Sequence, residues 1–419
     1  MDTMLSDTIS RFNHEYLSTI EKSDNIFYSP YGIATVLSIA ANGADGETKK
    51  ELLHALGCEA VPNEEYGEFQ KRFGKLYAKS VFLISSNLLL LGEKSVADAI
   101  NPDFIKTVTN FYQSEIREAD FAHDLAGERE RIRAWVDEKT QHIIPDYQSV
   151  VTDDAVLNFL NVICFKGEWA HEFDEGLKDG VLSSRKLRHI FGNKDGSESN
   201  VKFMSKEFWC SIPYYEDEKY KGIALPYRKD WDKNQTATAM LVIMPKDEND
   251  RNIAEEWVSE TVDYQREFMQ SIKDSSDEII VDVHLPKFEL TTNHDVKKSL
   301  AKMGVNLAFS DFAEFSSMVD YGKIKDGVKI GSISHQAKIE VDENGTEAAA
   351  VTEMIPLFWG FFPIPTPRPR CHVEFHAYRP FLFIIQDLAS GIDLFTGVVN
   401  KLYAHERKTI PLTNAISKT

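Results

Sequence analysis

The stretch ENGTEAAAVT, residues 343–352, decides the fold of this chain, because small and weakly polar side chains follow directly on a strand-like sequence. Residues 337–341 alternate between apolar and polar, which is the pattern of a half-buried strand. If residues 345–352 also form a strand, the even-numbered residues, all threonine or alanine, share one face. Such side chains could slide between existing strands with little steric clash. The sequence therefore predicts a strand that waits outside its sheet.

An apolar loop broken by proline follows, with the sequence MIPLFWGFFP at residues 354–363. A folded protein seldom exposes a continuous apolar segment unless the segment meets a partner. We therefore expect the loop to be functional.

Composition and charge exclude several classes of partner. The chain has 419 residues, 42% of them hydrophobic, which is typical of a folded protein with a large core. Lysine and arginine number 47 against 66 aspartate and glutamate, so the net charge is −19. A negative chain repels nucleic acid and acidic membranes, and the basic clusters at residues 185–188 and 401–408 are small. We expect no binding to nucleic acid, membranes or heparin.

The order of the predicted elements favours an α+β fold with mostly antiparallel sheets. Helical spacing of apolar residues dominates up to about residue 166, notably at residues 33–41, 49–56 and 132–144. Strand patterns follow at residues 236–244, 278–284, 337–341 and 381–386. No segment resembles a linker. We expect one domain over residues 1–400 and a polar tail over residues 401–419.

The termini, cysteines and glycosylation motifs bear on the compartment. The first residues enter a helical pattern with no basic, apolar leader, and no window is long and apolar enough to cross a membrane. The four cysteines lack the paired spacing of a zinc site or disulfide framework, so free thiols are expected. We predict a cytoplasmic protein, or one released without a cleavable signal peptide, although secretion stays open. Asn-x-Ser/Thr motifs at Asn234 and Asn344 leave glycosylation open, and a glycan on Asn344 would obstruct strand insertion.

The sequence contains none of the usual catalytic or nucleotide-binding motifs, so an enzyme is not expected. Cys371 and His372 with His376 could suggest a metal or a nucleophile, but a lone cluster beside a predicted strand is more typical of a structural role. His54 and Cys58 share a helix face and are explained equally well by packing. We predict no metal and no cofactor.

Five separated motifs resemble those of the serpin family, and the resemblance extends from about Leu5 to Asn400. They are NIFYSPYGI at residues 25–33 with GADGET at 43–48, IRAWVDEKT at 132–140, NVICFKGEW at 161–169, LPKF at 285–288 and FHAYRPFLF at 375–383. Two residues depart from the family's motifs. Arg133 stands where asparagine is usual, and Tyr378 stands where asparagine or aspartate is common. The chain is similar to the inhibitory, signal-less intracellular members.

The resemblance implies a metastable fold of three β-sheets and about nine α-helices, whose exposed reactive-centre loop, at about residues 343–372, inserts into a sheet. A target serine protease attacks the loop as a substrate and is trapped as a covalent acyl complex when the loop inserts. Such a protein is a monomeric suicide inhibitor and not an enzyme. A non-inhibitory binding or storage protein with the same fold is the alternative.

The resemblance also implies roles for residues at three sites. The hinge comprises Gly345, Thr346, Glu347, Ala348, Ala349 and Ala350. The breach, where insertion begins, comprises Trp169, Lys287 and Glu343, with an ion pair expected between the last two. The shutter beneath the central strands comprises Ser29, Asn161 and His335. Gly32 stands where a second shutter serine is usual, so one hydroxyl hydrogen bond, worth about 1 kcal/mol, is expected to be missing. We expect Thr346→Arg to stop insertion but leave folding intact.

The scissile bond in such inhibitors lies about 14 positions after the hinge glycine, which gives Trp359-Gly360, with Phe358-Trp359 second. These aromatic residues suit chymotrypsin-like proteases, and Leu357 suits elastase-like ones. Arg370 offers a bond to trypsin-like proteases. This bond would leave about 11 extra residues between hinge and bond, or roughly 35 Å of slack, and a slack tether cannot pull the protease against the inhibitor. The segment from Phe361 to Arg370 is a candidate secondary contact surface for the protease.

Overall fold

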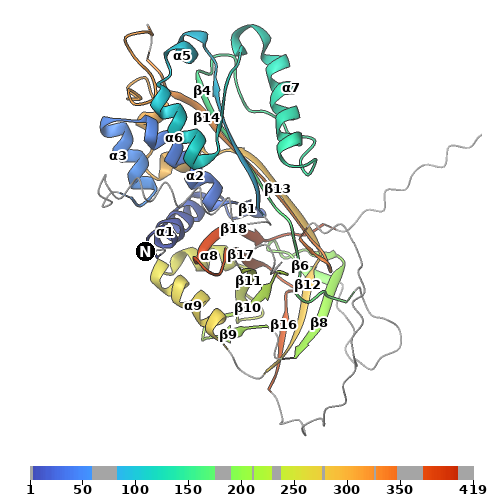
Figure 1. Ribbon diagram of the computed structural model, residues 1–419. Helices are drawn as coiled ribbons and strands as arrows, with labels where there is room; N and C mark the ends of the chain where they lie inside the picture. The colour runs from blue at the N-terminus through green and yellow to red at the C-terminus, as the bar shows by residue number, and fades with distance from the viewer. Residues whose placement is uncertain are drawn as a thin grey trace, which may run out of the picture.

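The computed structural model describes most of the chain, namely residues 3–58, 83–174, 190–209, 212–228, 237–275, 279–324, 327–346 and 371–403. These residues contain nine α-helices: α1 (Thr3–Thr19), α2 (Pro30–Gly43), α3 (Gly46–Ala55), α5 (Lys94–Ala99), α6 (Pro102–Tyr112), α7 (Phe121–Lys139), α8 (Ile253–Ser259), α9 (Val262–Asp274) and α10 (Lys297–Lys302). Figure 1 shows the long central strands running between α7 on one side and the helices near the N-terminus on the other.

Three larger sheets and one hairpin lie within the described residues. The central sheet contains β3 (Glu115–Glu118), β2 (Leu83–Leu91), β4 (Leu157–Phe165), β14 (Ile330–Val341) and β13 (Phe288–Asp295), with the short strands β5 (Gly167–Glu168) and β15 (Gly345–Thr346) at one end. The second sheet has the order β1 (Ile26–Tyr28), β18 (Ile392–Val399), β17 (Phe381–Asp387), β11 (Thr238–Pro245), β10 (Tyr220–Pro226) and β9 (Tyr214–Glu216). The third consists of β16 (His372–His376), β12 (Ile280–Pro286) and β8 (Phe203–Trp209), and the hairpin of β6 (Ile190–Gly192) and β7 (Glu198–Asn200).

The predicted α+β class and its three sheets are confirmed. The expected order of helices before strands is only partly right, because the long strands β2 and β4 lie before residue 166, and α8, α9 and α10 lie among the later strands. One helix boundary is wrong: the helical spacing at residues 132–144 predicted a helix through residue 144, but α7 ends at Lys139. Gln141 and His142 have φ values of 53° and 67°, in the left-handed region that ends a right-handed helix. The following apolar residues, Ile143 and Ile144, still pack beneath α7 without being helical.

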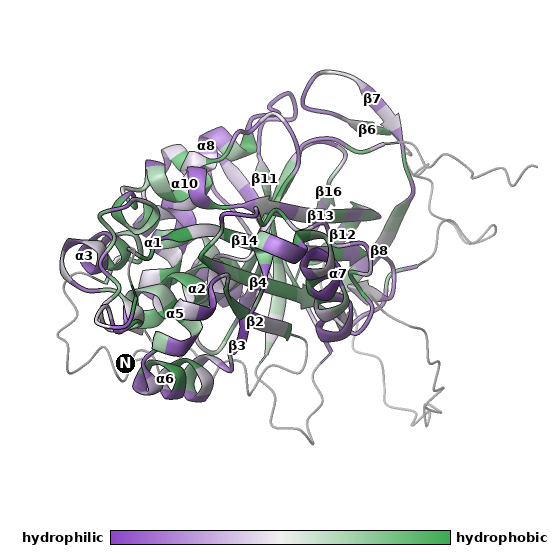
Figure 2. Cartoon of the chain, turned by 90° about the horizontal axis from the view of Figure 1, so that it is seen from above, coloured by the Kyte–Doolittle hydropathy of each residue, from purple (hydrophilic) through white to green (hydrophobic). Residues whose placement is uncertain are grey.

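Side chains on β4 alternate between two apolar clusters on opposite faces of the central sheet. Leu157, Phe159 and Ile163 belong to the larger cluster, and α2 contacts the sheet on this side. Leu160 and Val162 belong to a smaller cluster that includes the buried side of α7. Figure 2 shows β4 as a strongly hydrophobic strand between these two helices. The middle of the central sheet is therefore buried on both faces, which explains why β4 is an almost continuous apolar run.

The two middle strands, β4 and β14, pair directly and in parallel. Eight residue pairs join them, from Ile330 opposite Leu157 to Lys338 opposite Cys164. The other neighbours of these strands, β2 and β13, are antiparallel to them. Parallel pairing is slightly less stable per residue than antiparallel pairing. Among the long strands described in this sheet, the parallel pair formed by β4 and β14 thus lies at the centre.

Two polar side chains, Ser29 and Asp45, directly precede the helices α2 and α3. Ser29 caps α2 by accepting a hydrogen bond from Gly32 N–H, and it donates to the carbonyl of Leu394 in β18. Asp45, before α3, accepts hydrogen bonds from the hydroxyls of Ser316 and Ser317 and from the Ser317 N–H. These bonds hold the pKa of the Asp45 carboxyl below its ordinary value, although burial acts in the opposite direction.

Among the helices within the described residues, none combines the length and the apolarity that a bilayer-spanning segment requires.

Candidate functional site

The chain reverses direction where β14 ends, and this turn places β15 against two strands. The Asp342 carboxylate accepts hydrogen bonds from the N–H groups of Asn344 (2.8 Å) and Gly345 (3.1 Å), while the Asp342 N–H donates to the Gly345 carbonyl (2.9 Å). Thr346 then lies opposite Val341 of β14 and opposite Gly167 of β5, antiparallel to both. β15 is thus a short strand between β14 and β5.

The three predicted breach residues, Trp169, Lys287 and Glu343, meet around this turn. The indole N–H of Trp169 donates to the Asp342 carbonyl (2.9 Å), and its backbone N–H donates to the Asn344 carbonyl (2.9 Å). The Lys287 ammonium contacts the Glu343 carboxylate, and both side chains are largely buried. The expected ion pair is therefore present, and it joins the turn to the link between β12 and β13.

Gly345 and Thr346 are already enclosed by the sheet. A Cβ atom at Gly345 would lie 2.2 Å from the Gly167 carbonyl oxygen, so this close backbone approach requires glycine. Thr346 is fully buried, and its hydroxyl hydrogen-bonds to the phenol of Tyr227 (2.8 Å). Burial raises the pKa of Tyr227 well above its ordinary value, which keeps the phenol protonated. The Tyr227 ring stacks on Trp169 with centroids 4.6 Å apart.

The expectation that Thr346→Arg leaves folding intact is therefore wrong. Because Thr346 has no exposed surface, arginine there would bury an unpaired charge in the folded protein before any insertion. A variant that tests insertion has to change a residue beyond Thr346.

The predicted shutter residues form one buried network between α2 and the two middle strands. The Ser29 N–H donates to Nε2 of His335 (3.0 Å), so Nε2 must be the unprotonated ring nitrogen. His335 Nδ1 then carries the proton and donates to Asn161 Oδ1 (3.0 Å). The Asn161 amide donates in turn to Asn87 Oδ1 of β2 (2.9 Å). Since Asn161 is on β4 and His335 on β14, the network ties the parallel junction together.

Gly32 lies against this network and supplies no hydroxyl to it, and the space beside it is filled by Asn161. A Cβ atom at Gly32 would lie 2.4 Å from Asn161 Oδ1 and 3.2 Å from Ser29 Oγ. Asn161 therefore occupies the space that a side chain at residue 32 would need. Its Oδ1 already accepts a hydrogen bond from His335, so a side chain at residue 32 would have to displace an atom that is in use.

Sequence reasoning missed two members of these clusters, Asn87 and Tyr227. Asn87 is buried in the otherwise apolar end of β2, and a lone asparagine among leucines is a signal that a polar partner lies opposite. Tyr227 follows β10 in an ordinary sequence context and carries no comparable signal.

The remaining predicted residues of the loop lie outside the described residues. They are Glu347, Ala348, Ala349 and Ala350 of the hinge, the bonds formed by Phe358, Trp359 and Gly360, and the segment from Phe361 to Arg370. Asn234 also lies outside them, whereas Asn344 is half-buried in the turn.

The cysteines and histidines that could have suggested catalysis do not form a catalytic pair. Cys58 is buried, which raises the pKa of its thiol to about 12, while His54 is exposed. Cys371 is exposed, and it is the first described residue after residues 347–370. Of the cysteines within the described ranges, Cys58 and Cys371 are free thiols, and Cys164 is buried in β4.

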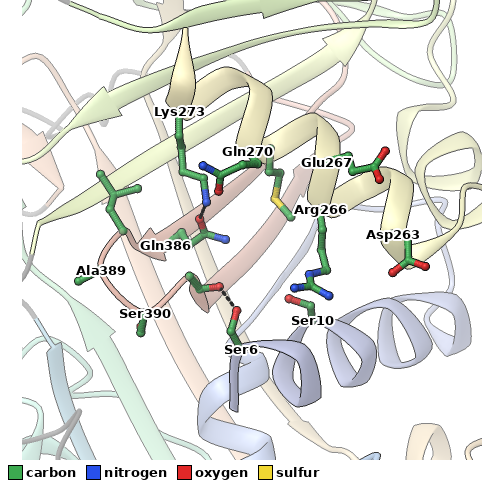
Figure 3. Close-up of a pocket in the computed structure, with 13 residues that line it drawn as sticks. Ser6, Ser10, Asp263, Arg266, Glu267, Gln270, Lys273, Gln386, Ala389 and Ser390 are labelled. Atoms are coloured by element: carbon green, nitrogen blue, oxygen red, sulfur yellow. Dashed lines mark hydrogen bonds between the residues drawn. The ribbon is translucent and has the colours of Figure 1, made fainter. Parts of the chain in front are cut away.

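A polar cavity of about 540 Å³ lies between α1, α9 and the turn from β17 to β18 (Figure 3). Its basic groups already have protein partners: Arg266 pairs with Asp7, and the Lys273 ammonium donates to the Gln386 amide oxygen (2.9 Å). Burial lowers the pKa of Lys273. We assign no function to this cavity.

Comparison with known proteins places these observations in a family. The family model described as serpin (serine protease inhibitor) matches residues 7–402. Leukocyte elastase inhibitor of Bos taurus is 30% identical over 403 residues, which cover 94% of this chain and 98% of the relative. Serpin B8 of Homo sapiens is 28% identical over 384 residues, or 90% and 93% of the two chains. Among solved structures, the thermophilic serpin tengpin in its native state matches with a TM-score of 0.76 and 25% identity, covering 96% of this chain and 95% of that one.

Proposed function

The chain belongs to the serpin family, and on this premise we propose that it inhibits serine proteases as a suicide substrate. The protease would cleave the reactive-centre loop and form an acyl intermediate. Insertion of the loop would then trap that intermediate as a covalent complex. The protein would contribute a conformational change and no catalysis of its own.

The observation that carries the proposal is the short strand β15, antiparallel to β14 on one side and to β5 on the other. β5 follows β4 in the chain, and β4 and β14 are parallel to each other. A strand that continued β15 between them would be antiparallel to both, which is the more stable pairing. β15 is therefore oriented as the first part of an inserted strand.

Continuing both registers predicts where each inserted residue would lie. Val341 and Gly167 lie opposite Thr346. Two residues further, Ala348 would lie between Ile339 and Phe165, which are both buried. Small side chains on this face would meet the core without a clash, in agreement with the proposed hinge.

The same registers, continued by six residues, bring Thr352 between His335 and Asn161. The hydrogen bond that now joins these two side chains (3.0 Å) would have to open when the inserting strand reaches this point. The Thr352 hydroxyl can both donate and accept, so it could replace the lost bond. We propose that the shutter network sets a threshold for insertion, and that the breach ion pair between Lys287 and Glu343 steadies the turn where insertion begins.

We further propose Trp359-Gly360 as the scissile bond, with Phe358-Trp359 second. The targets would be chymotrypsin-like or elastase-like proteases, and the name of the bovine leukocyte elastase inhibitor supports the latter class. The segment from Phe361 to Arg370 would add a secondary contact surface for the protease. We propose a monomer with one domain over residues 1–400 and a location in the cytoplasm, as the similarity to leukocyte elastase inhibitor and serpin B8 supports.

The test is to incubate the full chain with chymotrypsin and with a leukocyte elastase, and to look for a complex that resists SDS. We expect such a complex with at least one of them, and mass spectrometry of the released C-terminal fragment identifies the bond. Cleavage without a complex would instead support a non-inhibitory serpin. Cleavage after Arg370 by trypsin, with complex formation, would replace the proposed bond.

Two variants at neighbouring residues separate insertion from simple recognition. Ala348→Arg would place a charge between Ile339 and Phe165, and Glu347→Arg would place one between Glu340 and Lys166, which are both exposed. We expect Ala348→Arg to be cleaved without trapping the protease, because a buried unpaired charge blocks insertion. Glu347→Arg should still trap it. Equal trapping by both variants would contradict the proposed register.

A further inference from the structure

The sheet of β8, β12 and β16 has one apolar face and one polar face. Val281 and Val283 of β12 and Phe375 of β16 are fully buried on the side of the core. The opposite face carries Asp282 and His284 of β12, and the parallel register places them opposite Glu374 and His376 of β16. A row of potential metal ligands therefore crosses two neighbouring strands.

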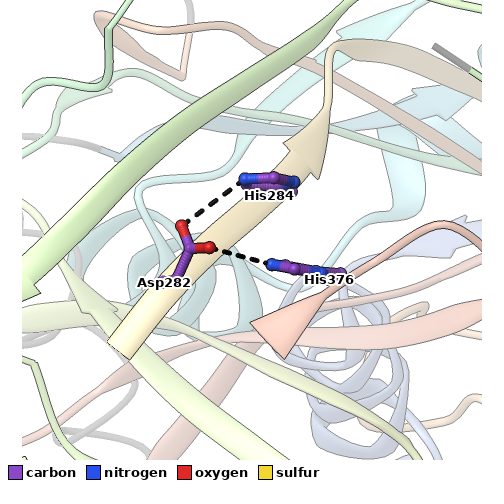
Figure 4. Close-up of side chains that lie close together, drawn as sticks. All are labelled: Asp282, His284 and His376. Carbon is purple, nitrogen blue, oxygen red and sulfur yellow. Dashed lines mark hydrogen bonds and ion pairs between the residues drawn. The ribbon is translucent and has the colours of Figure 1, made fainter. Parts of the chain in front are cut away.

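Asp282, His284 and His376 converge on one point of this face (Figure 4). His284 Nε2 lies 3.4 Å from one carboxylate oxygen of Asp282, and His376 Nε2 lies 3.2 Å from the other. The two imidazole rings stack with centroids 4.1 Å apart. One ligand atom from each residue lies within 4.8 Å of the other two, and Asp282 and His284 are buried.

We propose that these three side chains bind a zinc-like divalent transition-metal ion between β12 and β16. Two imidazoles and one carboxylate are a ligand set that Zn²⁺ takes in proteins, with bonds of about 2.0–2.2 Å. Ligand atoms around a tetrahedral ion with such bonds are about 3.3 Å apart, close to the two separations from Asp282. The fourth position would be taken by water.

The surroundings of the three ligands suit a metal site. Tyr378 contacts Nδ1 of His284 through its hydroxyl, so Nδ1–H can donate to that oxygen while Nε2 turns its lone pair to the ion. The Glu374 carboxylate lies 3.8 Å from Nδ1 of His376 and can orient the second imidazole in the same way. Each histidine thus has a neighbour that selects the tautomer needed for coordination.

The site would join β12 to β16. β16 is the strand that follows the loop, and β12 leads through Lys287 to the breach. A bound ion would therefore fasten β16 to the rest of the sheet. This inference does not depend on protease inhibition.

The experiment is a zinc titration of the full chain, stripped with EDTA and dialysed, against a chromophoric chelator. We expect one Zn²⁺ per chain, a higher unfolding temperature with zinc, and at least a tenfold loss of affinity in His376→Gln and in Asp282→Asn. The matched control is His372→Gln. His372 is on the same face of β16 but is exposed and near Glu207, and its replacement should leave binding unchanged.

Substitution with Co²⁺ gives a second, spectroscopic measurement on the wild type and the same variants. The strong visible bands of four- or five-coordinate cobalt are expected for the wild type and for His372→Gln, but not for His376→Gln. Weak six-coordinate bands, unchanged zinc affinity in His376→Gln, or a loss confined to His372→Gln would each overturn the proposal.

Discussion

Gly32→Ser should destabilise the protein, although it introduces the residue that serpins commonly carry at this position. The added Cβ would lie 2.4 Å from Asn161 Oδ1, and Asn161 is buried and held by His335 and Asn87. Displacing its oxygen breaks the bond to His335, so a cost of about 2–3 kcal/mol is expected for overpacking and the lost bond. Removing a glycine from α2 returns at most about 1 kcal/mol.

The net effect of Gly32→Ser is thus a loss of about 1–2 kcal/mol, or roughly 1–2 °C in the midpoint of thermal unfolding for a chain of this length. Scanning calorimetry at one fixed heating rate measures it, and Gly32→Ala is the control because it adds the same Cβ without the hydroxyl. Both variants should be destabilised to a similar extent. If Gly32→Ser unfolds at or above the wild-type temperature while Gly32→Ala does not, serine gains a hydrogen bond and the packing argument is refuted.

Three further predictions concern other contacts. Tyr227→Phe should cost about 1 kcal/mol of unfolding free energy in urea, because the buried Thr346 hydroxyl loses its partner; an unchanged urea midpoint would contradict this. Lys287→Met should cost about 2 kcal/mol by leaving the largely buried Glu343 carboxylate without its ion pair, and Glu343→Gln should cost less because the Lys287 ammonium that remains is the more exposed partner, at 19% against 11%, and can still donate to the glutamine amide oxygen; the reverse order in urea would refute the argument. Asp45→Asn should lower stability at neutral pH. Because the folded-state pKa of Asp45 lies below the ordinary value of 3.8, the difference should be present above that pH and shrink as the pH falls below it; a pH-independent difference between wild type and variant would show that the carboxylate charge is not involved.

The sequence predicted the fold class well because its motifs combine periodicity with residues that have few structural alternatives. The helical spacing at residues 33–41 predicted most of α2, and the alternation over residues 337–341 predicted part of β14. The expected meeting of Ser29, Asn161 and His335 rested on family resemblance, since these residues are more than 100 positions apart in the chain.

Other features could not be predicted, because they depend on distances between segments remote in sequence. Whether Gly32 leaves a gap or touches Asn161 depends on how closely α2 approaches β4. The position of His376 opposite His284 and next to Asp282 depends on the register of two strands that are some ninety residues apart. For the same reason the burial of Thr346 followed from the turn at Asp342 and not from its own local sequence.

The parallel pairing of β4 with β14 has a consequence for how the protein's stability should be measured. If insertion replaces this one ladder with two antiparallel ladders, the folded chain is separated from a more stable arrangement only by an activation barrier. Its persistence is then a lifetime and not an equilibrium quantity. Apparent melting temperatures should shift with heating rate, so variants of this chain have to be compared at one fixed rate and their half-lives at fixed temperature measured as well.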